Sequence, residues 1–235
     1  MIKGIIFDLD NTLYSYDLCN EVAMNAVIDY ALKSGFEREQ FLFAFEKGKK
    51  EVKERLGTNC AATHNRLLYF QRTLELLGQN PMCEAMVYYN QYWDNFLEAM
   101  KPYEGVFDFL NQLKSLGIKT AICTDLTAHI QYRKIKQLGL EAYVDILVTS
   151  EEVGAEKPDS KMFLTTLQKM EVMPHECTFI GDDYKKDILG AKNTSIEPIL
   201  LSDRKQTDVH RVSSFYELSK CFDHINRRWD WEAVK

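Results

Sequence analysis

Short apolar runs alternate with stretches of helical periodicity over most of this chain. The first run, GIIFDL, covers residues 4–9 and is rich in β-branched and aromatic residues, as expected for a buried strand. Four later segments resemble it: Lys119–Thr124, Asp145–Thr149, Thr178–Gly181 and Pro198–Leu201. Helical stretches lie between them, at about 105–116, 127–138, 159–171 and 184–193. This alternation predicts an α/β fold, a doubly wound parallel sheet with helices on both faces.

The segment from about 15 to 100 breaks the alternation, because it is helical throughout and has no strand-like run. Its expected breaks between four helices are Gly35, Gly57, Gly78 and Asn80-Pro81. We therefore predict a discontinuous α/β domain, residues 1–16 and 100–235, with a helical domain, residues 17–99, inserted after the first strand. The connections near 14–18 and 95–103 would let the insert open and close as a lid.

The composition excludes several classes of protein. The 235 residues are 46% hydrophobic and 27% charged, near the average for soluble globular proteins. A net charge of −6 would repel nucleic acid. No run approaches the roughly 18 apolar residues that span a membrane. The six cysteines lie far apart without a CxxC pair, which favours a reduced, cytoplasmic protein without structural zinc.

Polar residues follow the predicted strands where they end, the edge at which open parallel sheets bind ligands. These are Asp8-Leu9-Asp10-Asn11-Thr12, Thr124-Asp125 and Gly181-Asp182-Asp183, with Lys157-Pro158 opening the helix after the third strand. Each alone is more often a turn or a helix cap, but their occurrence in order indicates one site. Clustered carboxylates repel one another and should hold a divalent cation, and oxygen ligands favour Mg²⁺. Magnesium, a substrate phosphate and Lys157 together indicate phosphoryl transfer.

These residues, with Asp187, resemble the four motifs of the haloacid dehalogenase (HAD) superfamily over about residues 1–202, with the insert placed as in its C1-capped members. The resemblance is closest to capped phosphatases related to pyrimidine 5'-nucleotidase and N-acylneuraminate-9-phosphatase. It implies a Rossmann-like core, a helical-bundle cap and Mg²⁺-dependent hydrolysis of a small-molecule phosphate monoester through an aspartyl-phosphate. The expected substrate is a nucleoside monophosphate or a sugar phosphate.

The resemblance also implies a role for each matched residue. Asp8 would be the nucleophile, and Asp10 would be the general acid and then the general base. The side chains of Asp8 and Asp182, with the backbone carbonyl of Asp10, would bind the metal. Thr124 would hydrogen-bond the phosphoryl oxygens, and Lys157 would neutralise charge.

Further residues are expected around these. Asp187 and Asp183 would orient Lys157 or a metal-bound water. Thr12 and Asp125 are candidate substrate contacts. Position 125 is often Asn in related phosphatases, and we expect Asp125 to cap the following helix and to point away from the phosphate.

The helical insert and the C-terminus are less informative. Candidate substrate residues in the insert are His64 and Arg66, together with Lys47, Lys50 and Asn65. Its aromatic residues are expected to form its core: Phe36, Phe41, Phe43, Phe45 and Tyr69-Phe70. We expect a terminal helix over Ser213–Lys235, whose tryptophans either dock on the α/β domain or form a dimer contact. The protein is therefore expected to be a monomer or a homodimer.

Two other functions share these motifs. A phosphomutase would use every one of them, and a non-catalytic regulatory or binding module would keep the fold without the activity. A dehalogenase is disfavoured, because that class lacks an acidic residue at the position of Asp10. Release of inorganic phosphate separates a phosphatase from a mutase, and turnover of any phosphate ester excludes the non-catalytic module.

Overall fold

The chain folds into two compact units in this computed structural model, which describes residues 1–57, 59–203, 208–223 and 227–234. One unit consists of Met1–Ser15 and Lys101–Lys235, and the other of Tyr16–Met100. The division expected from the sequence was residues 1–16 and 100–235 against residues 17–99. None of the helices within the described ranges is long and apolar enough to cross a bilayer.

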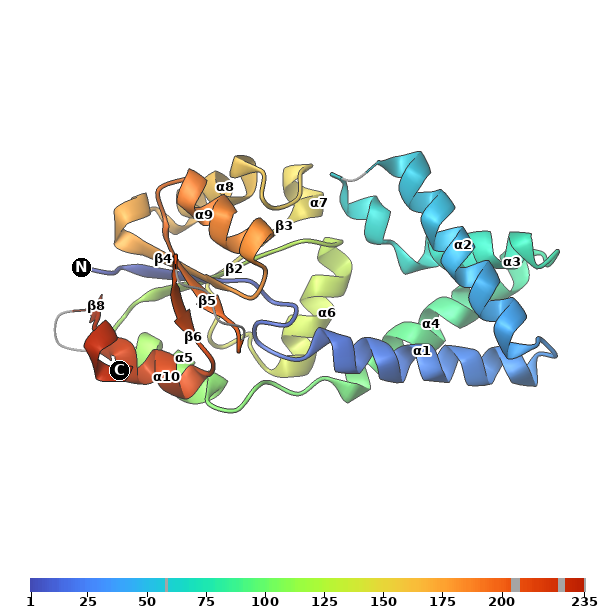
Figure 1. Cartoon of the computed structure of the whole chain (residues 1–235), viewed down its shortest axis with the longest axis horizontal. Coiled ribbons are helices and arrows are strands. Elements are labelled where there is room, and N and C mark those ends of the chain that lie inside the picture. Colours follow the sequence, from blue (N-terminus) through green and yellow to red (C-terminus); the bar gives the residue numbers. More distant parts are fainter. Residues whose placement is uncertain (58, 204–207, 224–226, 235) are drawn as a thin grey trace. The chain divides into compact units, whose positions relative to one another are not determined.

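The first unit is built on a parallel sheet of six strands with the order β3-β2-β1-β4-β5-β6 (Figure 1). The strands are β1 (Gly4–Phe7), β2 (Lys119–Thr124), β3 (Ile146–Thr149), β4 (Cys177–Gly181), β5 (Glu197–Leu201) and β6 (His210–Val212). The predicted doubly wound sheet is therefore confirmed. The edge strand β6 was not expected, because three residues are too few to show a pattern.

Helices cover both faces of this sheet (Figure 1). One face packs against α8 (Ser160–Met170) and α9 (Leu189–Asn193), through a core that includes Ile6 and Phe179. The other carries α5 (Val106–Ser115), α6 (Ala128–Leu138) and α10 (Phe215–Cys221), where Phe7 meets Phe109 and Phe215. Successive residues of β1 thus face opposite layers. The shorter helical elements are α7 (Ser150–Val153), η2 (Pro174–Glu176) and η3 (Tyr184–Ile188).

The predicted terminal helix over Ser213–Lys235 is wrong. In the described part of this segment, α10 ends at Cys221, and β7 (Phe222–Asp223) pairs antiparallel with β8 (Arg228–Trp229) ahead of η4 (Trp231–Val234). Trp229 packs against Phe109 and Phe222, and its indole N–H donates to the hydroxyl of Thr178, 2.9 Å away. Trp229 therefore docks on the α/β unit, where its polar atom finds a partner.

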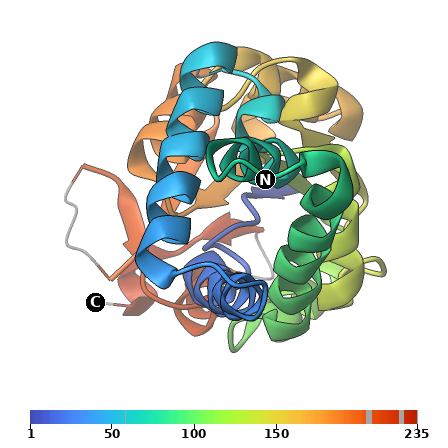
Figure 2. The same ribbon diagram turned by 90° about the vertical axis from the view of Figure 1, so that its right-hand side faces the viewer.

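The second unit is helical, as predicted. It contains α1 (Tyr16–Lys33), seen along its axis in Figure 2, α2 (Arg38–Leu56), η1 (Ala61–His64), α3 (Arg66–Leu76) and α4 (Pro81–Ala99). Asn80 caps α4 and Pro81 occupies its first turn, as the sequence suggested. Phe41, Phe45, Tyr69 and Phe70 are buried in its core. Phe43 is 72% exposed and does not belong to that core, because α2 turns it away from the face that carries Phe41 and Phe45.

Candidate active site

Two carboxylates follow the neighbouring strands at which the strand order reverses. Asp8 comes directly after β1, and Asp182 comes directly after β4. The two strands pair in parallel with Phe7 opposite Ile180, and the Asp8 N–H donates to the Ile180 carbonyl over 2.9 Å. This crevice beyond the carboxyl ends is where doubly wound sheets bind their ligands.

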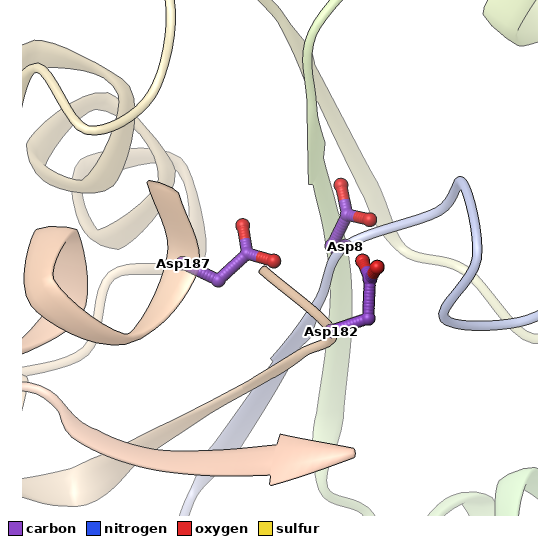
Figure 3. A group of neighbouring side chains, drawn as sticks. All are labelled: Asp8, Asp182 and Asp187. Atoms are coloured by element: carbon purple, nitrogen blue, oxygen red, sulfur yellow. The ribbon is translucent and has the colours of Figure 1, made fainter. Parts of the chain in front are cut away.

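Asp8, Asp182 and Asp187 turn their carboxylates toward one another (Figure 3). Lys157, on the loop between α7 and α8, lies between two of them: its Nζ is 2.5 Å from Asp8 Oδ1 and 2.7 Å from Asp187 Oδ1. The hydroxyl of Thr12 is 3.2 Å from Asp8 Oδ2 and 3.4 Å from Asp182 Oδ1. Three segments of the chain, residues 8–12, 157 and 182–187, thus bring five of the predicted residues together.

The glycine before Asp182 lets this cluster form. A Cβ on Gly181 would lie 2.3 Å from Asp187 Oδ2, closer than a side chain at that position allows. Asp187 also accepts the backbone N–H of Asp183 through the same oxygen, at 3.1 Å. The carboxylate of Asp187 therefore fits only because position 181 lacks a side chain.

The cluster holds more negative charge than its lysine balances. Burial, and after it the charge of Asp187, raise the pKa of Asp182 to about 7 against the opposing effect of Lys157. Burial likewise raises the pKa of Asp8 and of Asp187, and Lys157 offsets this only in part. Burial disfavours the charge of Lys157, but Asp187 and Asp8 outweigh it and hold the lysine pKa well above its ordinary value. A second cation would relieve the remaining repulsion.

The donor set fits magnesium. Asp8, Asp182 and Asp187 each offer one oxygen, and these atoms lie within 4.8 Å of one another. Carboxylate oxygens are the ligands that Mg²⁺ takes in proteins, usually one or two at a time with waters completing the shell.

Asp10 has partners that the sequence did not suggest. Its Oδ1 and Oδ2 lie 2.7 and 2.8 Å from Nζ of Lys134, on α6, and the Tyr14 hydroxyl donates to Oδ1 over 2.5 Å. Lys134 is completely buried. Its position four residues from both Ile130 and Leu138, on the buried face of α6, is the one signal by which the sequence could have revealed it.

Thr124 and Asp125, at the end of β2, contact other groups. The Thr124 hydroxyl accepts from Gln131 Nε2 over 2.7 Å. Asp125 accepts the backbone N–H of Lys157 at 3.0 Å and pairs with Nζ of Lys186 at 2.7 Å. The prediction that Asp125 caps the next helix is wrong, because the N-cap of α6 is Thr127. Asp125 instead holds the loop that carries Lys157.

Asp183 is exposed and caps η3, accepting the backbone N–H groups of Lys185 and Lys186. It therefore orients the turn that carries Asp187. Its carboxylate accepts these backbone groups, whereas that of Asp187 contacts Lys157, and Asp183 thus behaves as an ordinary aspartate at a helix start.

The substrate candidates of the helical unit were His64 and Arg66, and both line a cavity of about 320 Å³ within that unit. The guanidinium of Arg66 donates hydrogen bonds to the His64 carbonyl, at 2.7 Å, and to the Tyr16 hydroxyl. It also lies over the rings of Tyr69 and Tyr92. Lys49 and Lys53 add positive charge to the lining. Of the weaker candidates, Lys47 and Lys50 are exposed and Asn65 caps α3, so none of the three lines this cavity.

Comparison with known proteins identifies the family of this chain. Residues 2–194 match the model of the haloacid dehalogenase-like hydrolases. The chain is 37% identical to a ribulose-1,5-bisphosphate 5-phosphatase of Halopiger xanaduensis, over 95% of both chains. It is 27% identical to the pyrimidine 5'-nucleotidase YjjG of Escherichia coli, over 92% of this chain and 96% of that one.

A solved structure shows the same fold. The HAD phosphatase from Thermococcus onnurineus superimposes with a TM-score of 0.71 at 24% identity, over 93% of this chain and 97% of that one. The motif residues, the topology and the family match agree, and the chain belongs to the haloacid dehalogenase-like hydrolase family.

Proposed function

We propose that this protein is a Mg²⁺-dependent phosphatase that hydrolyses a small phosphorylated sugar through a phosphorylated Asp8. The observation that carries the proposal is the buried contact of Lys157 with Asp8 and Asp187, beside Asp182 at the switch point of the sheet. A buried carboxylate held by a lysine at this edge is suited to act as a nucleophile toward a bound phosphate.

In the first step, a carboxylate oxygen of Asp8 would attack phosphorus as the bond from phosphorus to the ester oxygen breaks. The leaving alkoxide would take its proton from the carboxyl group of Asp10. Lys157 would keep Asp8 ionised and offset charge on the phosphoryl oxygens, and Thr124 would donate a hydrogen bond to one of them. Bound magnesium would supply further positive charge for the phosphoryl group, held by Asp8 and Asp182.

In the second step, water would attack the phosphorus of the aspartyl-phosphate and give a proton to Asp10. The bond from phosphorus to the Asp8 oxygen would break, which releases inorganic phosphate and restores the carboxylate of Asp8. One residue would therefore donate a proton in the first step and receive one in the second.

The relatives support a phosphorylated sugar over a nucleotide. The ribulose-1,5-bisphosphate 5-phosphatase shares 37% of its residues with this chain over nearly its full length, against 27% for the nucleotidase. Within the helical unit, the cavity lined by Lys49, Lys53 and Arg66 also contains Glu46, which pairs with Lys49, and its remaining positive charge supports an anionic ligand. All six cysteines are free thiols, which supports the proposed cytoplasmic location.

The test is release of inorganic phosphate from a panel of esters with Mg²⁺ present. The panel contains ribulose 1,5-bisphosphate, glyceraldehyde 3-phosphate, ribose 5-phosphate, UMP and p-nitrophenyl phosphate. We expect a higher kcat/KM for a sugar phosphate than for UMP, and no turnover in EDTA. Preference for UMP would overturn the substrate class. Isomerisation of a sugar phosphate without release of phosphate would indicate a mutase, and no turnover of any ester would overturn the enzyme assignment.

A further inference from the structure

A completely buried lysine contacts the carboxylate of Asp10, and the proposed mechanism does not use it. Nζ of Lys134 lies 2.7 and 2.8 Å from the two oxygens of Asp10, although 124 residues separate the two along the chain. The Tyr14 hydroxyl donates to Oδ1 of the same carboxylate at 2.5 Å. The ammonium group also lies 5.9 Å from the centre of the Tyr14 ring.

Stability alone does not explain a lysine at this position. Moving an ammonium group from water into the interior costs several kcal/mol, and an ion pair recovers this only with good geometry. Lys134 lies on the buried face of α6 with Ile130, Ile135 and Leu138, where an apolar side chain of similar length would avoid the penalty. Asp10 is therefore in contact with a buried cation at a helix position where Leu or Met would ordinarily pack.

The contacts leave Asp10 open on one side only. Each carboxylate oxygen has two lone-pair positions, so Asp10 has four. Lys134 and Tyr14 occupy both positions on Oδ1, and Lys134 occupies one on Oδ2. The Asp10 side chain is 28% exposed whereas that of Lys134 is 0% exposed, so the lysine approaches from the protein interior. Among the contacts that the described part of the chain makes, one lone pair of Oδ2 remains for a group outside the protein.

We infer that Lys134 is a positioning residue, which together with Tyr14 fixes the carboxylate of Asp10 so that Oδ2 exchanges the proton with the leaving group and with water. This inference rests on the proposed function, because it assigns a partner to its acid and base. Charge-assisted hydrogen bonds to both oxygens restrict rotation of the carboxylate more than a single neutral donor does. The substrate itself would not contact Lys134, since that side chain is buried.

The test is a double-mutant cycle between Lys134 and Asp10, read as kcat on the best substrate of the panel. Lys134→Met keeps the length of the side chain and removes the donor. We expect kcat to fall about 10- to 100-fold, the usual effect of removing a partner that orients a catalytic group. KM should change little. In an Asp10→Asn background, Lys134→Met should have no further effect, because the residue through which it acts has already lost its function.

Two further variants guard against a folding defect. Tyr14→Phe removes only one hydroxyl and should lower kcat in the same direction, and Lys134→Arg should recover part of the loss. Lys136→Met, an exposed lysine of the same helix, is the matched control and should behave as wild type. Thermal unfolding of each variant shows whether it folds.

The outcomes separate the inference from the function on which it rests. A fall in kcat that is as large in the Asp10→Asn background as in wild type would assign Lys134 a purely structural role and overturn the inference. Wild-type kcat in folded Lys134→Met would do the same. If the wild-type protein released no phosphate from any ester of the panel, the proposed function would fail, and this inference with it.

Discussion

Replacing Lys157 with methionine tests the electrostatic account of the site. The lysine contacts Asp8 at 2.5 Å and Asp187 at 2.7 Å, and its side chain is 3% exposed. Methionine fills a similar volume but has no charge, so the variant leaves these buried carboxylates without the cation between them. Removing one partner of a buried ion pair typically costs ~3–5 kcal/mol.

This loss of folding free energy corresponds to a large fall in the melting temperature. For a protein of ~150–250 residues each kcal/mol corresponds to ~2–4 °C, which gives a fall of ~6–20 °C. The loss should also depend on pH. Without the cation, the folded-state pKa values of Asp8 and Asp187 rise further above their unfolded values. The pH-dependent part of the loss therefore develops as pH rises from the folded-state pKa values of wild type to the higher ones of the variant, and it is complete above them.

The assay is urea unfolding of Lys157→Met and wild type in EDTA at pH 5.5 and pH 8. We expect a larger difference in the free energy of unfolding at pH 8. Lys161→Met, an exposed lysine on α8, is the control and should stay within ~0.5 kcal/mol of wild type. A Lys157→Met loss as small as that of the control, or equal at the two pH values, would refute the reasoning.

Three more predictions concern the metal, the glycine and the helical unit. Because the pKa of Asp182 is about 7 without metal, protons compete with Mg²⁺ below that pH. Calorimetry should show affinity about tenfold higher at pH 8 than at pH 6, and a flat profile would contradict the assignment. Gly181→Ala would place a Cβ 2.3 Å from Asp187 Oδ2 and should lower both kcat and melting temperature, whereas unchanged kcat would argue against the observed packing. Arg66→Ala should change the order of kcat/KM among the panel substrates, whereas Lys47→Ala, on the exposed surface of α2, should not. An unchanged order in Arg66→Ala would remove that cavity from substrate recognition.

The strands of the sheet could be predicted where the burial of a strand is visible as a run of apolar residues in its own sequence. The bounds of β2, Lys119–Thr124, agree with the prediction because all its residues after the first are buried and the apolar run Ala121–Cys123 lies between two threonines. Strand β6 was missed because only Val212 of its three residues is buried. Its identity as a strand comes from pairing with β5, which leaves no pattern within the three residues themselves.

Some residues of the candidate site could likewise be predicted from the sequence, and others could not. Asp8 and Asp182 were found because each directly follows a strand, and parallel strands bring their carboxyl ends to one edge. Lys134 was missed because a lysine in a helix is ordinarily exposed, and its partner Asp10 lies 124 residues away. Asp125 was misinterpreted because its partner Lys186 comes from a different segment of the chain, and the sequence does not show that the two residues meet.

The proposed hydrolysis requires that Asp8 form a covalent bond to phosphorus. Acid quenching during turnover of the best panel substrate, followed by peptide mass spectrometry, detects that bond directly because acid slows the hydrolysis of an acyl phosphate. We expect phosphate on the peptide that contains Asp8. The Asp8→Asn variant should show neither this adduct nor turnover, because its amide is a poor nucleophile. Phosphate on a different residue, or an Asp8→Asn rate within about tenfold of wild type, would contradict it.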